Sequence, residues 1–143
     1  MMISDILRTK GTDVFWTRPD ATLDEVTRLL VRHNCGSLVV LSDAASKRML
    51  GIITERDILR ACAAAKQLDQ VKVSEVMTSD VVTGVANDSV QHGMGLMTEK
   101  RIRHLPVIEN EELAGIISIG DLVKAQHDEL SAENHYLKAY IQS

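Results

Sequence analysis

The sequence predicts an α/β (α+β) fold made of two β-α-β-β-α repeats, packed sheet to sheet with pseudo-twofold symmetry. The first observation behind this prediction is that GIITERDILR at residues 51–60 returns as GIISIGDLVK at residues 115–124. The second is that the upstream stretch also repeats, since residues 13–41 align with residues 80–108. Such self-similarity indicates one supersecondary unit written twice. A half this small buries too little of its sheet face alone.

Each repeat contains the same elements in the same order. A short extended segment comes first. A polar cap then leads into an amphipathic helix that starts near Leu23 or Val90, where apolar residues follow helical spacing. Two apolar runs separated by polar turns predict two strands, and a second helix begins at Thr54 or Ser118. The expected strands span residues 14–17, 37–41 and 49–53 in the first repeat and 81–85, 104–108 and 113–117 in the second.

The alignment predicts a first repeat at residues 1–66, a second at residues 67–126 and a helical tail at residues 127–143. Residues 67–77 link the two repeats. Their segment VSEVM echoes ISDIL at residues 3–7, so the repeat is expected to begin near the N-terminus. The tail has no counterpart in the first repeat. Its apolar stripe contains Leu130, Leu137 and Ile141. An amphipathic terminal helix of this kind favours a docking or dimer surface over a ligand site.

The composition is that of an ordinary globular protein and disfavours several classes of function. The net charge is −4 with no basic stripe, and only 3% of the residues are aromatic, so nucleic-acid binding is not expected. The two cysteines and five histidines lack metal-ligand spacing, so no metal site is predicted. No apolar run is long enough to span a bilayer and no leader is apparent, so free thiols in a reducing cytoplasm are the simplest interpretation.

The repeated turn allows two interpretations. A Thr or Ser followed three residues later by an acid is typical of a helix-capping box, and for a single motif this is the more common meaning. The same geometry also suits a nucleotide, because a helix start attracts phosphate and a carboxylate can accept hydrogen bonds from ribose hydroxyls. Cations lie near both turns in the sequence. Arg56 lies inside the first turn, and Arg103 and His104 directly precede the apolar run at residues 105–108, upstream of the second turn.

The motif G-h-h-[ST]-x-x-D written twice, with RHLPV before its second copy, resembles the CBS domain (cystathionine-beta-synthase domain) over residues 1–126. Two such domains in tandem resemble a Bateman module, and Lys10-Gly11 and TERD are similar to small stand-alone CBS-pair proteins of bacteria. The resemblance implies two clefts between the repeats that bind adenosyl ligands: AMP, ADP, ATP, NAD or S-adenosylmethionine. It also implies a flat, disc-like homodimer and an effector protein as partners.

The resemblance gives each matching position a role. Asp57 and Asp121 would bind ribose hydroxyls, and Thr54 and Ser118 would contact ribose or phosphate. The residues expected to border the adenine are Trp16, Thr17, Arg18, Val82 and Thr83. The opposite wall would contain Cys35, Gly36, Ser37, Leu38, Arg103, His104 and Pro106, and Arg56 would supply the first cleft with a cation. The clefts are expected to differ, because the first repeat lacks the basic pair Arg103-His104.

We therefore expect a regulatory module for signal transduction or energy sensing, with no catalytic cofactor, in which an adenine nucleotide favours one of two states. Two alternatives are a structural interaction module with unused clefts and a sensor of S-adenosylmethionine. An enzyme that uses Asp57, Arg56 and His104 on a nucleotide phosphate is disfavoured, because no nucleophile–base pair or metal set is evident.

Overall fold

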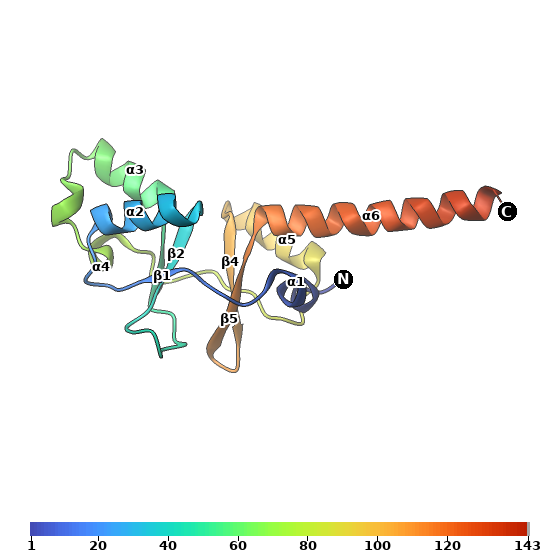
Figure 1. Ribbon diagram of the computed structural model, residues 1–143, viewed down its shortest axis with the longest axis horizontal. Helices are drawn as coiled ribbons and strands as arrows, with labels where there is room; N and C mark the ends of the chain where they lie inside the picture. Colours follow the sequence, from blue (N-terminus) through green and yellow to red (C-terminus); the bar gives the residue numbers. More distant parts are fainter. Residues whose placement is uncertain (143) are drawn as a thin grey trace. The chain divides into compact units, whose positions relative to one another are not determined.

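The computed structural model describes residues 1–142 as a mixed α/β protein that divides into two compact units (Figure 1). Unit 1 contains Met1–Thr12, Thr83–Glu109 and the chain from Ala114 onward, and unit 2 contains Asp13–Val82 and Asn110–Leu113. Helices and strands follow one another in the predicted order, so the α/β class is confirmed.

Unit 2 is built on a three-stranded sheet of order β1-β2-β3, in which β1 is parallel to β2 and β2 is antiparallel to β3. Its elements are β1 (Trp16–Thr17), α2 (Leu23–His33), β2 (Ser37–Val40), β3 (Gly51–Thr54), α3 (Glu55–Ala63), η1 (Leu68–Gln70) and α4 (Val73–Val76). β2 is buried along its whole length. Its residues Leu38 and Val40 belong to the core of the unit, together with Leu23, Val26 and Leu30 of α2.

Unit 1 contains the two-stranded sheet β4-β5. Its elements are α1 (Ile3–Lys10), α5 (Val90–Lys100), β4 (His104–Glu109), β5 (Glu112–Ser118, whose first two residues belong to unit 2) and α6 (Ile119–Gln142). Leu105, Ile117 and Leu122 are fully buried. The predicted tail at residues 127–143 is helical as far as the structure describes it, because α6 runs for 24 residues up to Gln142; residue 143 lies outside the described residues.

The main helices begin and end where their sequences predict. At the start of α2, Thr22 Oγ1 accepts a hydrogen bond from Glu25 N (3.2 Å) and the Glu25 carboxylate accepts one from Thr22 N (3.3 Å), which is a capping box. At the start of α5, Ser89 Oγ accepts from His92 N (3.0 Å). Asn34 and Arg101 end the two helices at equivalent positions in the left-handed conformation.

The opening strands are shorter than predicted. Only Trp16–Thr17 pairs as a strand in the first repeat, since Pro19 soon removes an N–H that further pairing would need. In the second repeat the pairing is a single parallel bridge between Gly84 and Val107. The chain then leaves the sheet, because the carbonyl of Ala86 accepts a hydrogen bond from Ser4 N at the start of α1 (2.9 Å).

The short helices α1 and α4 carry the echoed ISDIL and VSEV segments and pack in equivalent ways. In unit 1, Met2 bridges Ser89, which caps α5; in unit 2, Lys72 bridges Thr22, which caps α2. The helix that precedes the first repeat in the sequence therefore lies in the unit of the second repeat. The predicted repeat boundaries divide the sequence at residues 66 and 126, whereas the compact units divide the chain after Thr12 and after Val82.

Candidate functional site

The first hydroxyl–acid turn joins β3 to α3 in unit 2. Asp57 is buried, with 7% of its surface exposed. Its Oδ2 accepts hydrogen bonds from Thr54 N (2.9 Å) and from Thr54 Oγ1 (3.3 Å). Glu55 N donates to the carbonyl of Gly36 (3.1 Å), which fixes the helix start against the beginning of β2. The capping interpretation is therefore correct, and it uses one carboxylate oxygen of Asp57.

The second turn joins β5 to α6 in unit 1 and repeats this geometry. Asp121 Oδ2 accepts from Ser118 N (2.8 Å), and Asp121 N donates to Ser118 Oγ (3.1 Å). Ile119 N donates to the carbonyl of Arg103 (2.8 Å), just as Glu55 N does to Gly36. Arg103 and Gly36 therefore occupy equivalent positions, and only the second turn has a guanidinium attached there.

Lys10 contacts the second turn, and the sequence did not predict this contact. Its Nζ donates to Asp121 Oδ2 (2.6 Å) and to the carbonyl of Ile116 (2.9 Å) from the end of α1. The partial burial of Asp121 acts to raise the pKa of its carboxyl, but the hydrogen bonds from Lys10 and Ser118 outweigh burial and leave the pKa below its ordinary value. No local pattern could indicate this pair, because Lys10 and Asp121 lie 111 residues apart.

Within residues 1–142, the ion pair of Asp57 is made by Arg60 and not by Arg56. Arg60 Nη1 lies 3.7 Å from Asp57 Oδ1, and the Arg60 side chain is 72% exposed. The i,i+3 spacing of this pair on α3 could have predicted the contact. Arg56 is exposed on the same helix.

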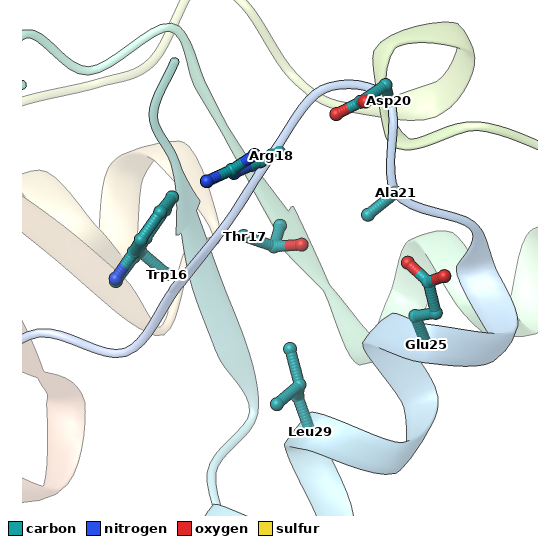
Figure 2. Close-up of a pocket in the computed structure, with 7 residues that line it drawn as sticks. All are labelled: Trp16, Thr17, Arg18, Asp20, Ala21, Glu25 and Leu29. Carbon is teal, nitrogen blue, oxygen red and sulfur yellow. The ribbon is translucent and has the colours of Figure 1, made fainter. Parts of the chain in front are cut away.

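Thr17 and Arg18 line a pocket of about 360 Å³ in unit 2 (Figure 2). Thr17 is buried at the end of β1, while the Arg18 guanidinium lies 5.9 Å from the centre of the Trp16 ring. The other lining residues are Asp20, Ala21, Glu25 and Leu29. The pocket therefore combines an indole, a guanidinium and two carboxylates.

The predicted residues of unit 2 lie at two ends of its sheet. Ser37 pairs with Thr54 at the start of β2, whereas Val40, at the end of β2, pairs with Thr17. Ser37 and Val40 are three positions apart along β2, which corresponds to about 10 Å in an extended strand. Cys35, Gly36, Ser37 and Leu38 lie at the Asp57 end, and Thr17 and Arg18 lie at the other.

The thiol of Cys35 is not an activated nucleophile. Burial raises the pKa of Cys35 above its ordinary value, the backbone of Ser37 acts in the opposite direction, and the negative charge of Glu55 raises the pKa further. A raised pKa leaves less thiolate, so Cys35 resembles a small apolar side chain more than a reactive thiol.

The remaining predicted residues divide between the units. In unit 1, Pro106 is buried in β4, His104 is half-buried at its start, and the side chain of Arg103 is exposed. Thr83 is also exposed in unit 1, and it precedes Gly84, whose N–H donates to the carbonyl of Pro106 (2.9 Å). Val82 is half-buried at the end of unit 2.

Residues 1–142 contain no group of three or more His, Cys, Asp or Glu residues arranged to hold a metal ion. Over the same range, no helix combines the length and apolar character that a bilayer crossing requires.

Comparison with known proteins identifies the family. The CBS domain model matches residues 3–64 and 73–128, so the chain belongs to the CBS domain family and carries the domain twice. The CBS domain-containing protein YhcV of Bacillus subtilis is 34% identical over 91% of this chain and 91% of its own length.

Solved structures agree with this assignment. The CBS-domain containing protein ATU1752 from Agrobacterium tumefaciens has a TM-score of 0.82 and 43% identity, covering 88% of this chain and 99% of that one. The CBS domain protein PAE2072 from Pyrobaculum aerophilum, solved in complex with AMP, has a TM-score of 0.75 and 30% identity, with coverage of 85% and 89%. The CBS domain pair of MJ0100, in complex with 5-methylthioadenosine and S-adenosyl-L-methionine, has a TM-score of 0.75 and 25% identity, with coverage of 87% and 98%.

Proposed function

We propose that this protein is a regulatory module without catalytic activity that binds an adenine nucleotide at its two hydroxyl–acid turns. AMP, ADP and ATP are the first candidates, and NAD is another. The similarity to proteins that bind AMP, or 5-methylthioadenosine and S-adenosylmethionine, supports an adenosyl group as the common element.

The observation that carries this proposal is the arrangement of the two aspartates. In each turn the cap uses Oδ2, through the N–H of Thr54 or Ser118. Among the contacts of residues 1–142, Oδ1 of Asp57 meets only the exposed Arg60, and none is recorded for Oδ1 of Asp121. One carboxylate oxygen in each turn is therefore not used by the cap and could accept hydrogen bonds from the hydroxyls of a ribose. Arg103 and His104 would supply the second turn with positive charge for a phosphate.

The test is calorimetry and thermal shift with AMP, ADP, ATP, NAD, NADH and S-adenosylmethionine, with GMP as the control for the base. At least one adenosine phosphate should raise the melting temperature. Loss of a hydrogen bond to a charged group weakens binding about ten- to a hundredfold, so Asp121→Asn and Asp57→Asn should each reduce affinity. Asp121→Asn should have the larger effect, because its turn also carries the basic pair.

Asp24→Asn is the matched control, since Asp24 only pairs with Arg28 on the surface of α2. Binding by both turn variants as tight as that of the parent would overturn the site assignment. If no compound shifts the melting temperature, the alternative of a structural interaction module is favoured. Turnover of ATP or NAD by the pure protein would revive the enzymatic alternative.

The partners of the module are also proposed. A homodimer and an unidentified effector protein would convert ligand occupancy into a response, because a ligand shifts an equilibrium only through different affinities for two states. A cytoplasmic location remains our prediction.

A further inference from the structure

The second half of α6 is an exposed helix with an apolar stripe. It extends beyond the other elements of unit 1 (Figure 1), and residues 127–142 are exposed throughout. Val123, Leu130, Leu137 and Ile141 are between 48% and 80% exposed. The same helix packs into unit 1 through Leu122 and Ala125, which are buried. At 3.6 residues per turn, the stripe lies roughly a third of a turn away from this inner face.

The stripe follows the heptad spacing of a coiled coil. Val123, Leu130 and Leu137 are seven residues apart and occupy d positions. The intervening a positions are then His127, Asn134 and Ile141. The seam covers 19 residues and about 28 Å of helix. From this we propose that the C-terminal helix forms a parallel two-stranded coiled coil with a second copy of the chain. The inference rests on the proposed homodimer and assigns its contact surface.

Asn134 favours this occupant and its direction. A single asparagine at an a position specifies a two-stranded, in-register pair, because the two amides can then bond to each other across the seam. In an antiparallel pair, a positions face d positions, and Asn134 would meet a leucine. Its amide would then lose water without gaining a partner, which is unfavourable.

Charge complementarity favours the same arrangement. Glu133 occupies a g position and Lys138 the following e position, which is the pair that meets between parallel helices. A twofold axis creates two such pairs, and within residues 1–142 no ion pair engages Glu133 or Lys138. An antiparallel pair would instead bring Lys124 and Lys138 of the other copy, which both occupy e positions, to the same side of the seam. Like charges there would oppose association.

Sedimentation equilibrium of the full chain tests the surface. The parent should be dimeric at tens of micromolar, and the double variant Leu130→Asp/Leu137→Asp should be monomeric with an unchanged circular dichroism spectrum, because both leucines are exposed. Glu133→Lys should weaken the dimer at least about fivefold, since it replaces two attractions with two repulsions. Adding Lys138→Glu should restore it, because the charges are then exchanged.

A cysteine cross-link tests the direction. In a Cys62→Ser background, oxidation should link Asn134→Cys chains to each other, whereas Ala132→Cys, on the outer face of the helix, should remain unlinked. A parent that is monomeric at all concentrations would overturn both this surface and the proposed homodimer. A double aspartate variant that remains dimeric would overturn only the coiled coil. Ligand binding, measured separately, decides the proposed nucleotide site.

Discussion

The turns at Asp57 and Asp121 have the same hydrogen-bonded frame but different charge partners. In both, a carboxylate accepts from the N–H three residues earlier, and the next N–H donates to the start of the neighbouring strand. Asp57 is buried, and its Oδ1 lies 3.7 Å from Nη1 of the exposed Arg60. Asp121 forms a closer ion pair, because its Oδ2 lies 2.6 Å from Lys10 Nζ. The repeated motif therefore determines the frame of both turns, whereas the ion pair of the second turn comes from Lys10, which lies outside the motif.

The largest effect should come from the paired leucines of the two cores. Leu38 and Leu105 occupy equivalent strand positions and are 1% and 0% exposed. Leu38→Ala and Leu105→Ala should each lower the free energy of unfolding by about 2–5 kcal/mol, because each leaves a cavity. Urea denaturation measures both, with the exposed Leu59→Ala as the control. A small loss in only one of them would show that the two repeats are not equivalent in their cores.

The two glycines that open the repeated motif should differ from each other. A Cβ on Gly51 would lie 2.6 Å from the backbone carbonyl oxygen of Thr78, which is held by the bridge to Ile52. A Cβ on Gly115 would lie 2.7 Å from the Cδ2 atom of Leu7, the far end of a side chain that can move. We expect Gly51→Ala to cost about 2–3 kcal/mol and Gly115→Ala less than about 1 kcal/mol. Equal costs in denaturation would contradict this distinction.

Removing Lys10 should make the second turn resemble the first. The lowered pKa of Asp121 means that the unfolded chain binds more protons than the folded one as the pH falls. The stabilisation by the Lys10–Asp121 ion pair is therefore complete above the pKa of the carboxyl in the unfolded chain, about 4. It is lost as the pH falls through the pKa of Asp121 in the folded protein. Lys10→Met should cost about 0.5–1 kcal/mol at neutral pH, since both groups are partly exposed.

Denaturation midpoints of the parent and Lys10→Met between neutral and acidic pH measure this difference. The two curves should converge at low pH. Arg8→Met provides the control, because Arg8 pairs with Asp5 on the surface of the same helix. A difference that persists unchanged in acid would show that Lys10 acts through packing instead of charge.

The smallest effect should come from the cation that only the second turn possesses. Arg103→Ala should reduce affinity for an adenosine phosphate about three- to tenfold, because an exposed guanidinium contributes modestly. It should leave the affinity for adenosine unchanged. Lys100→Ala, at the exposed end of α5, is the matched control. Equal losses for adenosine and its phosphates would place Arg103 away from the phosphate.

Local patterns predicted the frame of both turns but not their surroundings. Apolar periodicity and capping residues such as Thr22 and Ser89 correctly predicted α2 and α5, because these signals act within a few residues. Lys10 was missed because its partner lies 111 residues away. The echo of ISDIL in VSEVM predicted that the repeat begins near the N-terminus, but it did not indicate which unit each segment joins. That Thr17 and Thr54 lie at opposite ends of β2 follows only from the register of β2 with β1 and β3, which local sequence patterns do not contain.

The division of the chain also affects the order in which the protein can fold. Unit 2 is complete, apart from Asn110–Leu113, once residue 82 has left the ribosome, whereas unit 1 needs segments from both ends of the chain. Domains usually fold as units from the N-terminus during synthesis. We therefore expect α1, which is made before every element of unit 2, to dock only after the later segments of unit 1 have been made. Its buried residues Ile3, Ile6 and Leu7 would remain exposed to chaperones until the second repeat emerges.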